Sequence, residues 1–199
     1  VGSGKEVGDE LANHATVQAL SFTGSHGVGH GIYQQLAPRM TRAQMEMGGK
    51  NPTIVLADAD LDFAAKIVGL AGFGQTGQVC TATSRVIVNE KVADEFTEKL
   101  VEQAKARNVG NGMADGVTMG PAVSAGELKG NLDYIKIAND EGAECVWGGE
   151  RLSEGDLEHG HFMSPAVIAN VKNSMRIAQE EVFGPVVSVV KCGDFDEAI

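Results

Sequence analysis

The chain has 199 residues, of which 43% are hydrophobic and 22% charged, a composition typical of a globular protein that buries a sizeable core. Its formal net charge of −11 argues against a nucleic-acid partner, because phosphate recognition requires clustered lysines and arginines. The sequence shows no signal-peptide pattern and no apolar run of transmembrane length, so we expect no membrane partner. Three widely spaced cysteines fit a reducing compartment better than a disulfide framework, and we predict a cytoplasmic protein.

Both ends of the chain look like cuts through a structural unit. The first residues, VGSGKEVG, lack an initiator methionine and include Gly4 and Gly8. They resemble a glycine-rich turn that follows a strand, although their spacing is not the strict dinucleotide-binding one. The last residues form a buried-type strand followed by Asp194 as the N-cap of a helix that then stops. We therefore expect a fragment of a longer protein.

Short β-branched segments alternate with helical segments along the chain. Apolar residues recur at helical spacing in 90–106 and again in 124–143, whereas the glycine-rich segment 110–121 is predicted to be a loop. This alternation is typical of an α/β fold with a mainly parallel sheet flanked by helices. Strands are predicted at 19–24, 52–58, 84–90, 143–148, 164–171 and 186–192.

A first polar motif, ALSFTGSHGVGHGIYQQL, predicts a strand, a glycine-rich turn and a helix. The free N–H groups of such a turn, together with the positive end of the helix, can bind a pyrophosphate. However, Gly24, Gly27 and Gly29 do not have the strict dinucleotide-binding spacing. A tight turn that needs glycine for a positive φ is an equally good interpretation.

Glu46 lies between two methionines, just ahead of Gly48 and Gly49. An apolar setting suits a carboxyl group to general-base catalysis, and two adjacent glycines let another chain or a ligand approach closely. The alternative is an exposed carboxylate on a strand, which is the usual role of a single glutamate.

Cys80 lies between glycines and small hydroxylated residues in the segment GQTGQVCTATSR. A structural cysteine needs only apolar neighbours, whereas this polar setting is typical of a nucleophile. We therefore expect Cys80 to be accessible. Cys145 and Cys192 lie inside strand patterns, and we expect them to be core thiols.

A third motif, IAQEEVFGPVVSVV, ends a predicted helix and opens a strand. Glu181 could bind sugar hydroxyls there, and the ring of Phe183 could flank a flat ligand. Taken alone, the residues favour a helix stop at Gly184 and Pro185 with Phe183 in the core.

Two other groups of residues have simpler interpretations. His159 and His161 lie in a polar loop without a convincing third ligand, so we predict no metal site. Lys50, next to Asn-Pro, is expected to pair with a surface carboxylate.

Four motifs in this order, FTGS, EMGGKNP, GQVC and EEVFGP, resemble those of the NAD(P)-dependent aldehyde dehydrogenase superfamily over essentially the whole chain. The flanks of the middle two look most like the branch that oxidises semialdehydes of dicarboxylic acids, such as α-ketoglutarate or succinate semialdehyde. The resemblance implies a two-domain enzyme in which residues 1–47 end a Rossmann-like cofactor domain. Residues 48–199 would then form most of a catalytic domain truncated at its C-terminus.

The resemblance also implies the roles of individual residues. Cys80 corresponds to the nucleophile and Glu46 to the general base. The resemblance implies oxidation of a small-molecule aldehyde with NAD or NADP. Strand edges left unpaired at both ends of the fragment predict association into a homo-oligomer. An inactive structural or assembly fragment is the alternative, and no residue here matches the upstream amide that completes the family's oxyanion hole. The implied cofactor-binding residues are Gly4, Gly8, Gly24, Ser25, Gly29, Met47, Glu181 and Phe183.

Overall fold

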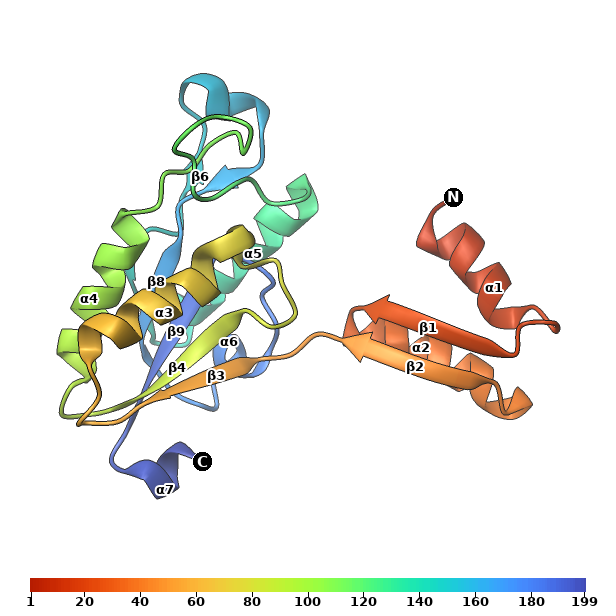
Figure 1. Cartoon of the computed structure of the whole chain (residues 1–199), viewed down its shortest axis with the longest axis horizontal. Coiled ribbons are helices and arrows are strands. Elements are labelled where there is room, and N and C mark those ends of the chain that lie inside the picture. The colour runs from red at the N-terminus through yellow and green to blue at the C-terminus, as the bar shows by residue number, and fades with distance from the viewer. The chain divides into compact units, whose positions relative to one another are not determined.

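The computed structural model describes residues 1–199 and forms two compact units, Val1–Gly48 and Gly49–Ile199 (Figure 1). Each unit has a sheet of its own. None of the helices combines the length and the apolar character that crossing a membrane requires.

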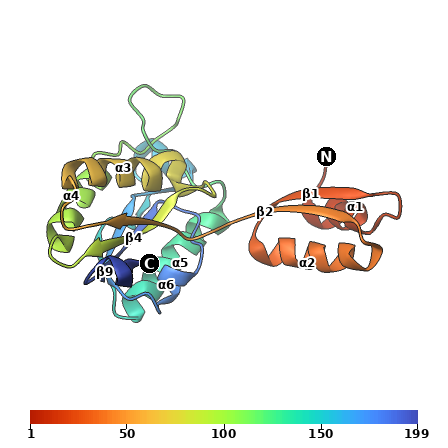
Figure 2. The same ribbon diagram turned by 60° about the horizontal axis from the view of Figure 1, so that its bottom comes forward.

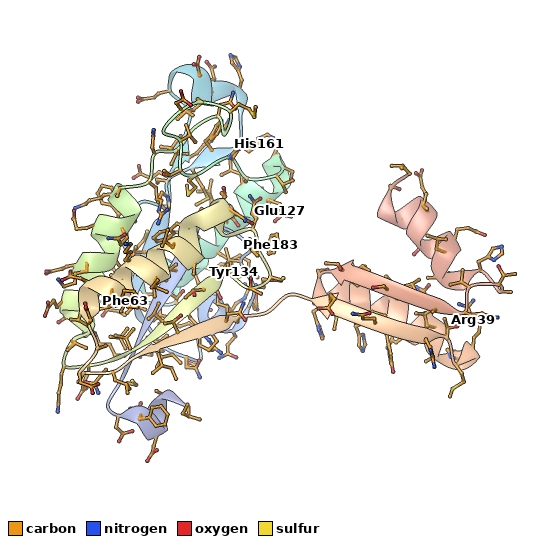
Figure 3. All side chains as sticks on the ribbon, viewed as in Figure 1. Arg39, Phe63, Glu127, Tyr134, His161 and Phe183 are labelled. Atoms are coloured by element: carbon orange, nitrogen blue, oxygen red, sulfur yellow. The ribbon has the colours of Figure 1, made fainter.

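The first unit is built around a parallel strand pair. The two strands are connected by a helix that Figure 2 shows against one face of the pair. The guanidinium group of Arg39, labelled in Figure 3, donates to the carbonyls of Ala12 and Asn13 and so ties the first helix to the turn that precedes the second strand. The elements are a π-helical turn (Gly4–Gly8), α1 (Asp9–Asn13), β1 (Ala19–Gly24), α2 (His26–Leu36), a 3-10 turn (Ala37–Arg39) and β2 (Arg42–Met47).

The second unit is built around a five-stranded sheet of order β3-β4-β9-β8-β5. Its first four strands are mutually parallel, and β5 is an antiparallel edge strand. A separate antiparallel pair, β6 (Arg151–Leu152) and β7 (Phe162–Met163), lies outside this sheet. The sheet strands are β3 (Asn51–Val55), β4 (Thr83–Asn89), β5 (Glu144–Trp147), β8 (Ala166–Val171) and β9 (Val186–Cys192).

Helices cover both faces of this sheet, as Figure 2 shows, with α3 and α4 on one side and α5 and α6 on the other. Two of them have side-chain N-caps: Asp60 accepts from the N–H of Phe63, and Ser124 from that of Glu127. The helices are α3 (Leu61–Phe73), α4 (Ala93–Lys105), α5 (Ala125–Asp140), α6 (Arg176–Gln179) and α7 (Phe195–Ala198), with 3-10 turns at Gly74–Gly77 and Gly155–His159.

Because successive side chains of a strand point to opposite faces, β9 contributes to two separate hydrophobic cores. Val187 and Val189 pack into the core that includes residues of α3 and α4, and Val186 and Val190 into the core that includes α5 and α6. Burial on both faces explains why this central parallel strand reads as a continuous apolar run. The predicted fold class is therefore confirmed. The six predicted strands and the helices predicted at 90–106 and 124–143 are all present, with small shifts at their ends.

Candidate active site

Cys80 lies in the loop that joins α3 to β4, and its side chain is exposed. Upstream of it, Gln75, Thr76 and Gly77 adopt left-handed conformations with φ of 50°, 60° and 64°. A Cβ atom on Gly77 would lie 2.1 Å from the carbonyl oxygen of Gly184. Only glycine allows both this φ and this close approach, so the Cys80 loop packs directly against the loop that precedes β9.

Side-chain amides hold the Cys80 loop in place. Asn51, the first residue of β3, donates from Nδ2 to the carbonyls of Cys80 (2.7 Å) and Ala82 (3.2 Å). Gln78 donates to and accepts from the backbone of segment 121–123. The backbone N–H of Cys80 donates to no acceptor within the chain. It is therefore free to bind an oxygen atom that develops negative charge next to the thiol.

The loop between α6 and β9 supplies a carboxylate and an aromatic ring. The N–H of Gly49 donates to Oε1 of Glu181 at 3.2 Å. Phe183 has a φ of 57° and is 37% exposed, so the interpretation that places its ring in the core is wrong. The left-handed turn at Phe183 lies ahead of β9, which starts at Val186, and leaves the ring at the surface.

A shallow depression brings these two loops together. Cys80, Glu181 and Phe183 all line it, with Gly49 and Gly77 beside them. The loops lead into β4 and β9, which are hydrogen-bonded neighbours in the sheet. The second unit thus unites a thiol, a carboxylate and an exposed ring from motifs that are far apart in the sequence. Figure 3 labels Phe183 at this edge of the unit.

The residue that precedes Glu181 is anchored by an ion pair and a phenol. Glu180 accepts two hydrogen bonds from Arg176, at 3.0 and 2.9 Å, and one of 2.7 Å from the hydroxyl of Tyr134 on α5. The Arg176 hydrogen bonds and then the Tyr134 hydroxyl lower the pKa of Glu180 to about 2. This network fixes the start of the Glu181 loop to α5.

Lys50 does not make the predicted surface ion pair. Its ammonium nitrogen is buried and has no hydrogen-bond partner. Burial and, to a smaller extent, the charge of Arg85 lower the pKa of Lys50 to about 8, while the charge of Glu181 opposes both effects. The expectation failed because position along the chain does not reveal that the side chain is enclosed.

In the first unit, the side chain of Glu46 is exposed and accepts a hydrogen bond from Gln44 at 3.2 Å. The expectation that methionines surround it is wrong. Met45 and Met47 are its neighbours in β2 and therefore point to the opposite face of the strand. Met47 lies on the face that packs against α2, where its sulfur would meet a Cβ added to Gly29 at 2.6 Å.

The glycine-rich motif after β1 is a direct strand-to-helix junction. Gly24 ends β1, and a single extended residue, Ser25, separates it from α2, which starts at His26. Gly27 and Gly29 lie inside the helix, and none of these glycines has a positive φ. The interpretation as a tight turn that needs glycine for a positive φ is therefore wrong, whereas pyrophosphate binding at this junction stays a prediction. Gly29 permits close packing of α2 on β2, and Gly24 permits close packing on the ring of Phe22. The first N–H groups of α2 remain open, as an anion such as pyrophosphate requires.

Several other predicted residues have plain structural positions. Gly4 and Gly8 lie in a helical turn that runs into α1 instead of a glycine-rich turn, with no atom near a Cβ built on either and no positive φ. Cys192 is buried, and Cys145 is half-buried against the same core as α5. Burial raises the pKa of both thiols, which keeps them protonated and unreactive.

The whole chain matches one protein family. Residues 1–199 match the aldehyde dehydrogenase family. The chain therefore belongs to the aldehyde dehydrogenase family.

Several individual members of the family are similar to this chain over its whole length. The chain is 45% identical over 198 residues to alpha-ketoglutaric semialdehyde dehydrogenase of Bacillus subtilis, and 49% identical over 199 residues to alpha-ketoglutarate semialdehyde dehydrogenase of Haloferax volcanii. Both matches cover 100% of this chain and 41% of the relative. A crystal structure of betaine aldehyde dehydrogenase from Staphylococcus aureus in complex with NAD+ has a TM-score of 0.96 and 40% identity, covering 100% of this chain and 39% of that one. The chain thus spans about two fifths of the length of the relatives it matches.

Proposed function

We propose that this chain supplies the nucleophile and part of the cofactor site of an NAD(P)-dependent aldehyde dehydrogenase that acts on a dicarboxylic semialdehyde. The observation that supports this most directly is the depression in which the exposed Cys80 meets Glu181 and Phe183. Under this proposal residues 1–47 belong to the cofactor domain and residues 48–199 to the catalytic domain.

The reaction begins at Cys80. Its thiolate attacks the aldehyde carbonyl carbon, forming a C–S bond while the carbonyl π electrons move to oxygen. The open N–H of Cys80 donates to that oxygen. When bound, NAD(P)+ supplies the acceptor for the hydride that leaves the same carbon. Loss of the hydride reforms the C=O bond and leaves an acyl thioester on Cys80.

Hydrolysis of the thioester completes the cycle. Glu46 removes a proton from a water molecule, whose oxygen attacks the acyl carbon. The C–S bond then breaks, so that the acid is released and Cys80 returns to its thiolate form. An exposed carboxylate, as observed for Glu46, is open to water.

The remaining proposed roles concern the cofactor. Glu181 binds the hydroxyls of the nicotinamide ribose, and Phe183 flanks the nicotinamide ring. Hydride transfer depends on accurate placement of the reacting atoms, and both residues lie in a loop that is anchored at Glu180. In the first unit, Gly24 and Ser25 directly precede α2, and we propose that they leave its first N–H groups free to bind the pyrophosphate. The other proposed cofactor residues of this unit are Gly29, Met47, Gly4 and Gly8.

The substrate class and the cofactor rest on the relatives. Two of them are named for alpha-ketoglutarate semialdehyde, and another, from Saccharolobus solfataricus, is a 2,5-dioxopentanoate dehydrogenase with 44% identity. The betaine aldehyde dehydrogenase structure contains NAD+. We propose a five-carbon keto-semialdehyde as the first substrate to test, with NAD+ and NADP+ compared.

The test is NAD(P)H formation by the complete gene product that carries these residues. Cys80→Ser should abolish turnover of α-ketoglutarate semialdehyde, while Cys145→Ser and Cys192→Ser serve as matched controls and retain it. Substantial turnover by Cys80→Ser would show that Cys80 is not the nucleophile. Pentanal, which lacks the distal carboxylate, should react at least tenfold less efficiently, and equal kcat/KM for both aldehydes would refute the substrate class.

A further inference from the structure

Lys50 carries a charge that the proposed mechanism does not use. Its ammonium nitrogen is buried without a hydrogen-bond partner, although buried charges are ordinarily paired or hydrogen-bonded. The charges that act on it are the guanidinium of Arg85 on β4 and the carboxylate of Glu181. Glu181 is thus the group whose charge favours the ammonium form.

The backbone next to Lys50 holds the same carboxylate. Gly49 directly precedes Lys50, and its N–H donates to Oε1 of Glu181 at 3.2 Å. A hydrogen bond and a positive charge from consecutive residues therefore act on one carboxyl group. That group lines the depression beside Cys80.

Arg85 uses one end of its guanidinium elsewhere, although its Nε, like the Lys50 nitrogen, is buried without a hydrogen-bond partner. Its Nη1 donates to Oδ1 of Asn173 at 3.2 Å and to the carbonyl of Ala178 at 3.3 Å. The Lys50 ammonium makes no such bonds, so its charge is available to Glu181.

We propose that Lys50 is a positioning residue whose positive charge holds the Glu181 carboxylate turned toward the depression beside Cys80, and that it thereby strengthens binding of the nicotinamide ribose. The inference rests on the proposed function, because it assigns Glu181 to the cofactor. A carboxylate can accept hydrogen bonds from both ribose hydroxyls, provided that its two oxygens face the ribose. Lys50 acts through Glu181 and touches neither substrate nor cofactor.

A double-mutant cycle on the complete gene product tests this. The dissociation constant for NAD+ is measured by calorimetry for the unaltered protein, Lys50→Met, Glu181→Gln and the double variant. We expect each single change to weaken NAD+ binding about tenfold. The coupling between the two changes would then also be about tenfold, which is typical of neighbouring charges. The double variant should bind no more weakly than Glu181→Gln alone. Lys66→Met, the same change at an exposed lysine of α3, is the matched control and should leave binding unchanged.

The outcomes separate the inference from the function on which it rests. If Lys50→Met weakens binding as much in the Glu181→Gln background as in the unaltered protein, Lys50 acts independently of Glu181 and the inference is wrong. An unchanged dissociation constant in Lys50→Met also overturns it. If instead Glu181→Gln alone alters neither NAD+ binding nor the rate of the first hydride transfer, the cofactor role of Glu181 fails first.

A second variant covers a failure of Lys50→Met to fold. Lys50→Arg keeps the positive charge and should retain NAD+ binding within about threefold. Lys50→Gln, which removes the charge but keeps a polar end, should reproduce the tenfold loss. Equal binding by Lys50→Arg and Lys50→Gln would show that charge at this position is irrelevant.

Discussion

Replacing Lys50 by methionine should stabilise the second unit at neutral pH. The pKa of Lys50 falls from an ordinary value of 10.5 to about 8 on folding, which corresponds to about 3 kcal/mol of unfavourable free energy for the charged form. Methionine removes the charge and retains an unbranched apolar chain. We therefore expect the free energy of unfolding of Lys50→Met at pH 7 to exceed that of the unaltered chain by about 3 kcal/mol.

The pH dependence of this difference has a definite sign. Below pH 8 the lysine is protonated in both the folded and unfolded chains, and the full penalty applies. Between pH 8 and 10.5 the unfolded chain holds a proton that the folded chain does not, so the stability of the unaltered chain rises with pH relative to Lys50→Met. The advantage of the variant should therefore shrink across that window.

Urea unfolding followed by the fluorescence of Trp147 measures both effects. Trp147 is the single tryptophan of the chain and lies in β5, so it reports on the second unit. Packing differences between lysine and methionine are the same at every pH, so the pH-dependent part isolates the charge. Lys66→Met should change stability by less than about 0.5 kcal/mol. A Lys50→Met advantage that is absent at pH 7, or constant up to pH 10.5, would refute the burial argument.

Three further predictions concern the site. Gly77→Ala should lower the free energy of unfolding by more than about 2 kcal/mol, because the new side chain strains a φ of 64° and its Cβ meets a carbonyl oxygen at 2.1 Å. Gly74→Ala is the control, because a Cβ at that position has no atom within 4 Å. Equal stability of the two variants would contradict the geometry. Asn51→Ala should lower kcat at least about tenfold by releasing the carbonyl of Cys80, and unchanged kcat would show that the amide is dispensable. Glu46→Gln should give a burst of NAD(P)H followed by slow turnover as the acyl-enzyme accumulates, whereas loss of the burst would place Glu46 in thiol activation.

Much of the second unit's architecture could be predicted because its central strand β9 is buried on both faces. The segment VVSVVKC of β9 leaves only Lys191 exposed, and such a run is hard to place anywhere but inside a parallel sheet. In contrast, α3 was not singled out. Its sequence, LDFAAKIVGLAGF, is apolar on nearly every face, with Phe63 and Leu70 exposed, so it lacks the polar stripe by which an amphipathic helix is recognised.

The site could be predicted only as a set of residue types. Accessibility of Cys80 followed from its polar neighbours, and the structure places it at the surface. The surroundings of Glu46 and Phe183 were misjudged, because sequence neighbours of a strand residue lie on its opposite face and because a left-handed backbone leaves no clear mark in the sequence. Asn51 and Gly77 were missed as anchors. Their only signals were an amide at the start of a strand and a glycine just ahead of the thiol.

The neighbouring positions of β4 and β9 hold the two loops of the site side by side, although the loops are far apart in the sequence. The ladder from Arg85 and Ser188 onward fixes one loop against the other, while the intervening residues fold back through α4, α5 and β8. Parts of the intervening chain do bond to the loops of the site. Gln78 bonds to segment 121–123, Thr76 donates to the carbonyl of Gly120, and Tyr134 of α5 donates to Glu180. The exposed tip at 111–116 has no such tie to the site. Insertions and deletions in that exposed tip should therefore leave the distance between the Cys80 thiol and the Glu181 carboxylate unchanged.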